Sequence, residues 1–311
     1  MFAPSFKYPR MVPSLKKYLK WLDKRPPYEF EPGSHKATEA SKAAVAAWEA
    51  KLIDLAALVP EGEPRAYYRA KLVWMCRDKT QNGAPAVTVS PSGKYTLSVT
   101  HHQTGKSTWD TTKGVVSHTN GADIETVCRN YSHFPFAWVE GHGKTGEDYL
   151  ICGESYQGQT VVNLTTGERL DYIPQEADEG MGFCWVGIYP NSKGTLLAVD
   201  GCVWGGPYEV LIVDFSSPME LPWRILRHEC NGNELSFEKW DDENTCRLVH
   251  TDDVVNLPGH PLDGKVDGSL TDSEDEEVQA EVYRRVKEQG SYTGWREGKF
   301  PHVVVVPRED V

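Results

Sequence analysis

The sequence has no apolar run approaching the roughly 20 residues that a membrane helix needs. Its first residues, MFAPSFKYPRMVPSLKKYLKW, also lack the apolar core of a secretory signal peptide. We therefore expect a protein without a membrane span, and we expect it in the cytoplasm.

The sequence also lacks paired cysteine motifs. Its seven cysteines are scattered, none forms a C-x-x-C pair, and no His lies at zinc-finger spacing. An odd number of cysteines in a chain without a secretion signal favours free thiols in a reducing compartment. We expect most of them to be small core residues.

The common catalytic and nucleotide-binding motifs are missing. There is no P-loop and no G-x-G-x-x-G, so neither ATP nor NAD is predicted, and the cofactor is left open. The segment nearest to a nucleophile elbow, Gly153–Gln157, has no second glycine. No reaction is therefore indicated by motif.

Positive charge is scarce outside the N-terminal region. The formal net charge is −12, and residues 1–71 are basic, so the whole acidic excess lies in 72–311. Phosphate contacts need clustered Lys and Arg, so we expect no nucleic-acid partner. An acidic surface of this kind is typical of a soluble protein.

Residues 1–71 predict a basic arm that contains helices. Ser14 can cap a helix that runs to Lys24 and is stopped by the prolines that follow. A second helix fits residues 36–58, where Val45, Trp48 and Leu52 recur at helical spacing. We expect the basic first helix to pack on the acidic remainder of the chain.

Residues 72–311 predict one mainly β domain. Short runs rich in β-branched and aromatic residues alternate with Gly, Pro, Asn and Asp, as in Tyr95–Thr100 and Tyr149–Cys152. The stretch 261–290 differs: it predicts an exposed acidic loop followed by a helix at about 275–289. His302–Val306 predicts a final strand.

An internal repeat organises the β region. Gly93–Gly114 aligns with Gly146–Gly167 over 22 residues without a gap, so that Leu97 matches Leu150 and Gly114 matches Gly167. A third copy starts at Gly194. Each copy has a turn, a strand, a glycine-containing connection and a second strand, which is a β-meander with a period near 50 residues.

The segment VSPSGKYTLSV…TWDTTKGVV resembles a WD40-type propeller blade, with Trp109-Asp110 at the place of that family's Trp-Asp pair. The resemblance covers roughly residues 86–250 and implies a small β-propeller of four or five blades. A fourth unit fits Leu235–Val255, and a further one could combine Lys71–Cys76 with His302–Val306. The alternative is an irregular β-sandwich.

Polar and aromatic residues follow the first strand of each copy and predict a ligand site. In a propeller, matching positions lie on one face around one axis, so these residues could converge, with Glu140 and His142 on a nearby rim. The predicted ligand-binding residues are His101, His102, Glu140, His142, Glu154, Tyr156, Asp200 and Trp204. Such a set could bind a divalent metal or exchange protons. The alternative is that these side chains only hydrogen-bond to turns.

The function that fits best is that of a non-catalytic binding or scaffold protein. A propeller face could hold a protein, a peptide or a small neutral or cationic ligand, and the oligomeric state is left open. One alternative is a hydrolase or lyase that uses a metal or carboxylates on the propeller axis. Another is a structural component of a larger particle.

Overall fold

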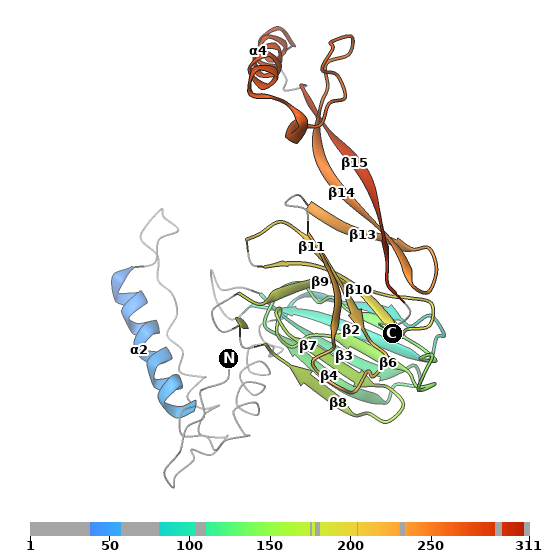
Figure 1. Cartoon of the computed structure of the whole chain (residues 1–311). Coiled ribbons are helices and arrows are strands. Elements are labelled where there is room, and N and C mark those ends of the chain that lie inside the picture. Colours follow the sequence, from blue (N-terminus) through green and yellow to red (C-terminus); the bar gives the residue numbers. More distant parts are fainter. Residues whose placement is uncertain are drawn as a thin grey trace. The chain divides into compact units, whose positions relative to one another are not determined.

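The computed structural model describes residues 38–56, 81–103, 110–174, 176–177, 181–203, 205–230, 234–289 and 294–307 (Figure 1). Contacts divide the chain into two compact units. Unit 1 comprises residues 1–186 and 218–222, and unit 2 comprises 187–217 and 223–311.

Strands dominate the described residues, so the expected mainly β fold is confirmed. Four antiparallel sheets follow one another along the chain, and in each the strands pair in sequence order. The first sheet contains β1 (Gln81–Val89), β2 (Tyr95–His102), β3 (Thr111–His118) and β4 (Asp123–Arg129). The second contains β5 (Ala137–Val139), β6 (Tyr149–Cys152), β7 (Gln159–Asn163) and β8 (Arg169–Tyr172).

The third sheet contains β9 (Phe183–Pro190), β10 (Leu196–Val203), β11 (Glu209–Asp214) and β12 (Ile225–Glu229). The fourth contains β13 (Glu234–Trp240), β14 (Thr245–Val255) and β15 (Trp295–Val305). The described helices are α2 (Glu39–Ala56), η3 (Asp267–Ser269) and α4 (Asp272–Gln289).

One hydrogen bond recurs in three sheets and identifies the repeated unit. The backbone N–H of the residue that follows the third strand of a sheet donates to the carbonyl of the residue that precedes its second strand. The pairs are Thr119 to Lys94 at 3.0 Å, Leu164 to Asp148 at 2.7 Å and Phe215 to Thr195 at 2.9 Å. The meander repeat expected from the sequence is therefore present in the first three sheets.

The register of the repeat differs from the gapless alignment. The turn glycine precedes its strand by two positions at Gly93 and Gly194, but by three positions at Gly146. This extra residue shifts the match by one position, so Leu97 corresponds to Ile151 and not to Leu150. A shift of one residue in a strand moves a side chain to the opposite face of the sheet.

The glycine match of the alignment is also wrong. Gly114 lies inside β3, where an added Cβ would come within 2.6 Å of the Phe134 ring. Gly167 instead lies in the turn after β7 with a φ of 76°. The two glycines thus have different roles, close packing for Gly114 and a left-handed turn for Gly167.

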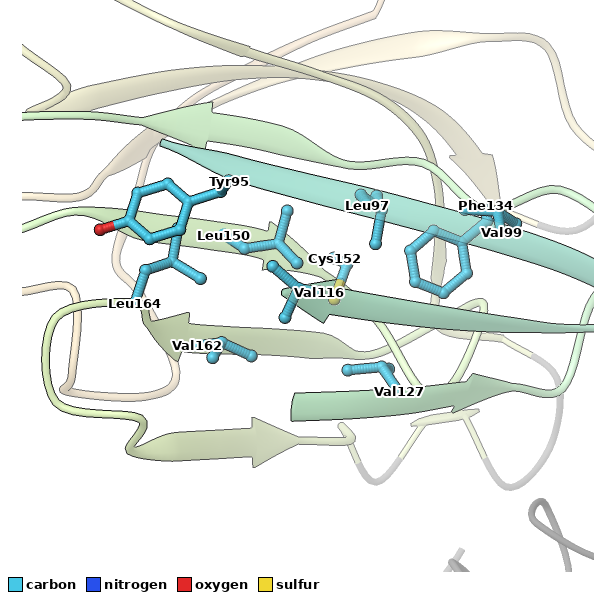
Figure 2. Packing of buried hydrophobic residues seen from close by; sticks show 10 residues of the cluster. All are labelled: Tyr95, Leu97, Val99, Val116, Val127, Phe134, Leu150, Cys152, Val162 and Leu164. Atoms are coloured by element: carbon cyan, nitrogen blue, oxygen red, sulfur yellow. The ribbon is translucent and has the colours of Figure 1, made fainter. Parts of the chain in front are cut away.

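The core of unit 1 lies between the first and second sheets (Figure 2). Leu97 from β2 and Val116 from β3 face Leu150 and Cys152 from β6. Leu97 is 1% exposed and Leu150 is fully buried. Complete burial of such a side chain stabilises the fold by about 1.5–3 kcal/mol.

Unit 2 has a comparable core between the third and fourth sheets. Leu196 and Ala198 from β10 pack with Leu248 from β14 and Val304 from β15. β15 pairs with β14 along its whole length, from Thr245 opposite Val305 to Val255 opposite Trp295. His302–Val306 was expected in a further unit with Lys71–Cys76, but residues 302–305 belong to β15 and pair with β14 in the fourth sheet. Lys71–Cys76 lies outside the described residues, so its pairing with this segment stays a prediction.

The far end of the β14–β15 ribbon leads to α4 (Figure 1). Thr271 and Glu274 form one half of a capping box, because the Glu274 carboxylate accepts a hydrogen bond from the Thr271 backbone amide at 3.1 Å. Val278 and Val282 on α4 are buried against Val255 and Leu257, which gives this end of unit 2 a small core of its own.

The N-terminal region is described only in part. α2 lies where the second helix of the arm was expected, and its Val45 and Trp48 side chains are buried. The helix expected at Ser14–Lys24 lies outside the described residues. Among the helices that the structure describes, none combines the length and the apolar character needed to cross a membrane.

Candidate functional site: the two ends of unit 1 and the centre of unit 2

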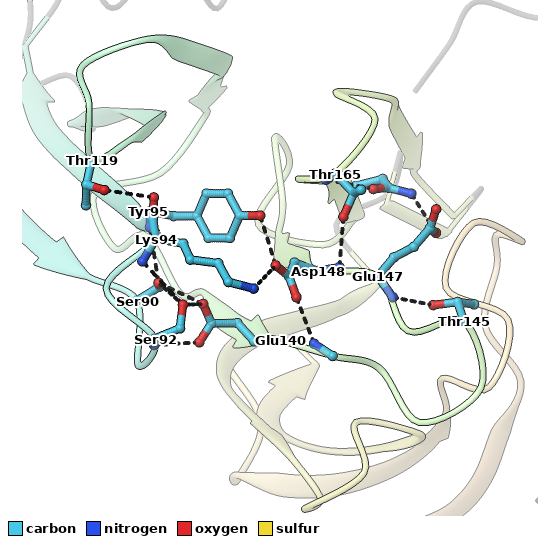
Figure 3. Close-up of polar contacts among 12 residues, drawn as sticks. Ser90, Ser92, Lys94, Tyr95, Thr119, Glu140, Thr145, Glu147, Asp148 and Thr165 are labelled. Carbon is cyan, nitrogen blue, oxygen red and sulfur yellow. Dashed lines mark hydrogen bonds and ion pairs between the residues drawn. The ribbon is translucent and has the colours of Figure 1, made fainter.

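Glu140 joins the first two sheets at the end that carries the β1–β2 and β5–β6 turns (Figure 3). Its carboxylate accepts hydrogen bonds from the Ser90 hydroxyl at 2.9 Å and the Ser92 backbone N–H at 2.8 Å, and also from the Ser92 hydroxyl. Glu140 thus closes the β1–β2 turn, as in the alternative that assigned these side chains to turns.

Asp148 forms a second link at the same end of unit 1. Its carboxylate accepts from Lys94 Nζ at 3.0 Å, the Tyr95 hydroxyl at 2.9 Å and the Gly141 N–H at 2.8 Å (Figure 3). Burial opposes ionisation of Asp148, but these donors together lower its pKa. The sequence did not single out Asp148, although it precedes the strand in the repeat.

His142 is buried within the β5–β6 turn. Its Nδ1 accepts hydrogen bonds from the backbone amides of Lys144 at 3.3 Å and Thr145 at 3.2 Å, and its ring meets Tyr149 edge-on. The side chain is 1% exposed. The histidine therefore acts as the internal cap of this turn.

His101 and His102 lie at the opposite end of unit 1. Both belong to the end of β2, which has 8 residues, so they lie about 23 Å from the turn that Glu140 closes. His102 is fully buried, and its Nε2 is 2.8 Å from the Thr100 hydroxyl. His101 is partly exposed.

Glu154 belongs to a buried ionic cluster. Its carboxylate is 2.6 Å from Arg169, which also binds Asp171 at 2.9 Å. Burial opposes the charge of Arg169, but the two carboxylates raise its pKa, so the guanidinium stays ionised. Because Glu154 is only 2% exposed and ion-paired, it is a structural anchor in this conformation.

Tyr156 lies in the β6–β7 connection, next to Tyr131 from the segment that follows β4. The two ring centroids are 5.5 Å apart, and both residues are partly exposed. Asn130 binds this connection twice: its backbone N–H donates to Glu154 O at 3.0 Å, and its Oδ1 accepts from the Tyr156 N–H at 2.9 Å. We call Tyr131 and Tyr156 the tyrosine platform.

Arg129 holds the segments that carry the tyrosine platform. Its side chain is 1% exposed and donates to four backbone carbonyls. The acceptors are His133 O at 2.8 Å, Gly153 O at 2.8 Å, Ser155 O at 2.9 Å and Trp185 O at 3.2 Å. The platform therefore rests on backbone that is fixed by several charge-assisted hydrogen bonds.

Asp200 lies inside β10 of unit 2 and not in the loop after it. Its carboxylate accepts from the Phe237 N–H at 2.8 Å and the Tyr189 hydroxyl at 3.2 Å. Burial raises its pKa to about 6, and the two hydrogen bonds only partly oppose this shift. Trp204 lies outside the described residues.

Within unit 1 the predicted set is thus divided between two ends. Glu140 and His142 lie at the end with the β1–β2 and β5–β6 turns, while His101, His102, Glu154 and Tyr156 lie at the platform end. Glu140 and His142 were expected on a rim near the other residues, but they lie at the opposite end of the strands. The convergence of the platform-end residues with Asp200 and Trp204 stays a prediction.

A group that sequence analysis missed lies in unit 2. Ligand atoms of Glu209, His228 and Cys230 all lie within 4.8 Å of one another. Glu209 and His228 are 19 residues apart in the sequence, yet His228 Nε2 lies 2.6 Å from a carboxylate oxygen of Glu209. The signal available in the sequence was His-x-Cys at the end of a strand, which places both side chains on one face.

No family model matches the chain. Among curated proteins, it is 35% identical over 164 residues to the uncharacterized protein R762 of Acanthamoeba polyphaga mimivirus. The match covers 52% of this chain and 59% of that protein, so the chain spans less than two thirds of the relative's length.

Two solved structures show weak likenesses. The apo AtxE2 isopeptidase has a TM-score of 0.27 at 13% identity, over 73% of this chain and 29% of that one. A bifunctional GH43-CE protein of Bacteroides eggerthii has a TM-score of 0.28 at 12% identity, over 53% of this chain and 22% of that one. Likenesses at this level bear neither on the fold nor on the function.

Proposed function

We propose that this protein is a non-catalytic binding protein with a small β-propeller as its scaffold. The tyrosine platform at one end of unit 1 would receive a peptide or protein segment. The observation that carries the proposal is the pair Tyr131 and Tyr156, partly exposed and resting on segments that Arg129 holds through four hydrogen bonds.

The direction in which the sheets pack supports the propeller. In the structural register, Leu97 of the first sheet corresponds to Ala198 of the third, and each faces the sheet that comes next in the chain. Leu150 lies on the opposite face of the second sheet and packs against Leu97 of the first sheet. Blades around an axis pack front to back in this way, whereas two sheets related by a twofold axis pack front to front. An experimental structure in which successive sheets are related by a twofold axis would favour the sandwich alternative.

The chemistry of the platform supports a binding role. Partly exposed tyrosines offer a large, rigid contact surface with a hydrogen-bonding hydroxyl, and they lose little conformational entropy on binding. The backbone that Arg129 holds near them reduces the cost of ordering the site further. The net charge of −12 favours a neutral or cationic segment over an anionic one.

The test begins with a random peptide library selected on the purified full-length chain. Peptides that use the platform should bind Tyr131→Ala and Tyr156→Ala at least about 10-fold more weakly than the unchanged protein. Tyr283→Ala is the matched control, because Tyr283 is 74% exposed on α4 and should not affect binding.

Two results would contradict the proposal. One is a selection that enriches no peptide above background. The other is a set of peptides whose affinities are the same for the unchanged protein and for both platform variants.

A further inference from the structure

The third sheet places three metal-binding side chains on one face. β11 and β12 pair with Val210 opposite Glu229 and Leu211 opposite His228, so Glu209 lies opposite Cys230. Because side chains alternate along a strand, Glu209, His228 and Cys230 all project from the same face. Their ligand atoms lie within 4.8 Å of one another.

The surroundings leave room for an ion. On the other side of β11, the residue opposite Glu209 is Gly201, which has no side chain. The side chain of His228 is 48% exposed and that of Glu209 is 19% exposed, and Cys230 is an exposed free thiol. Solvent can thus reach the cluster and supply a further ligand.

The chemistry of the three groups selects the metal. Magnesium and calcium prefer oxygen ligands, whereas a thiolate and an imidazole together with one carboxylate suit zinc. We propose that Glu209, His228 and Cys230 form a zinc site with three protein ligands and a water molecule in the fourth position.

The geometry needs only small side-chain movements. Zinc bonds of about 2.0–2.3 Å in a tetrahedral arrangement place ligand atoms roughly 3.5 Å apart. The distance of 2.6 Å between His228 Nε2 and the Glu209 oxygen must increase by about 1 Å. Any distance between ligand atoms that is close to the 4.8 Å limit must shorten by a similar amount. We expect rotation of these partly exposed and exposed side chains to provide these changes without movement of the strands.

Zinc binding changes the protonation of its ligands and links two neighbouring strands. The thiolate binds the metal, so the Cys230 S–H proton passes to the buffer when zinc binds. The proton between His228 Nε2 and the Glu209 carboxylate must also move to Nδ1 or to the buffer before zinc can bind both groups. β12 is the edge strand of the third sheet, and the ion would join it to β11. The proposal does not depend on the tyrosine platform, which lies in unit 1.

The test is a cobalt titration of the reduced full-length protein, followed by displacement with zinc. One equivalent of Co²⁺ should produce the visible bands of tetrahedral coordination and a near-ultraviolet thiolate charge-transfer band. Cys230→Ser should abolish the thiolate band, and Glu209→Gln and His228→Ala should each weaken zinc binding at least about 10-fold.

Two variants serve as matched controls. His302→Ala alters a histidine that lies 3.4 Å from the carboxylate of Glu229 on β12, and Cys202→Ser alters a thiol on β10. Both should bind zinc as the unchanged protein does. Near-ultraviolet circular dichroism without metal checks that every variant is folded.

Three outcomes would overturn the proposal. The first is the absence of a stoichiometric thiolate band in the unchanged protein. The second is a band that survives in the folded Cys230→Ser variant. The third is a band lost in Cys230→Ser together with unchanged affinity in Glu209→Gln and His228→Ala, which would reduce the site to a single thiol.

Discussion

Replacing Asp200 by Asn should stabilise unit 2 at neutral pH. Asn has nearly the same shape, and its side-chain oxygen can still accept the hydrogen bond of the Phe237 N–H, which Asp200 accepts at 2.8 Å. The substitution removes the charge that burial makes unfavourable, and the new side-chain NH₂ can donate to the Tyr189 hydroxyl, which donates to Asp200 in the unchanged protein. Asp200 is 7% exposed, and its described hydrogen-bond donors, Phe237 N–H and the Tyr189 hydroxyl, are uncharged.

The size of the effect follows from the pKa of Asp200. Burial raises this pKa from 3.8 to about 6, and each pKa unit corresponds to about 1.4 kcal/mol. Between these two pH values the folded chain holds a proton that the unfolded chain has lost, so the free energy of unfolding falls as the pH rises. Above about pH 6, the ionised Asp200 therefore costs about 3 kcal/mol, a cost that Asp200→Asn removes.

The assay compares urea unfolding of the two proteins across pH 3.5–8, followed by tryptophan fluorescence. The stability of Asp200→Asn relative to the unchanged protein should be near zero at the acid end and reach about 3 kcal/mol above pH 6. The ¹³C resonance of the Asp200 carboxyl should titrate near pH 6 in the folded protein. Asp242→Asn is the control: backbone hydrogen bonds from Asn244 and Thr245 lower the pKa of Asp242, so removing its charge should not stabilise the protein at neutral pH.

The reasoning is refuted if the carboxyl of Asp200 titrates at or below pH 4. It is equally refuted if the stability difference between the two proteins is independent of pH, because the linkage requires the difference to appear between the two pKa values.

Three further substitutions test the packing of unit 1 by urea unfolding. Leu150→Ala leaves a cavity between the first and second sheets and should cost about 2–5 kcal/mol. Gly114→Ala places a methyl group against the Phe134 ring and should cost about 1–3 kcal/mol, part of which Phe134→Leu should restore; full stability in Gly114→Ala would contradict this contact. Arg169→Met leaves the buried carboxylates of Glu154 and Asp171 without this cation and should cost about 3–5 kcal/mol at neutral pH.

The strands were largely readable from the sequence. Tyr95–Thr100 and Tyr149–Cys152 are short runs of β-branched and apolar residues between turns, and both coincide with strands. The acidic residues at the start of α4 and the basic residues near its end likewise indicated a helix. Such signals are local, because backbone preference and burial act within a few residues of one another.

The register of the repeat could not be predicted from the sequence to within one residue. Gly93 and Gly146 are both turn glycines with positive φ. A gapless alignment of the two copies therefore takes them as equivalent positions. The turn at Gly146 holds one more residue, and only the pairing of neighbouring strands reveals which face Leu150 occupies. Strand pairing depends on the energy of the whole sheet, which no single turn encodes.

The sequence by itself determined the residue types that could serve a site and the strands that carry them. The tertiary structure alone decided their partners. It pairs Glu154 with Arg169 across 15 residues and brings Glu209 to Cys230 across 21 residues. The physical reason is that charge and hydrogen-bond partners are set by strand order and register, which bring together residues whose local sequences carry no sign of one another.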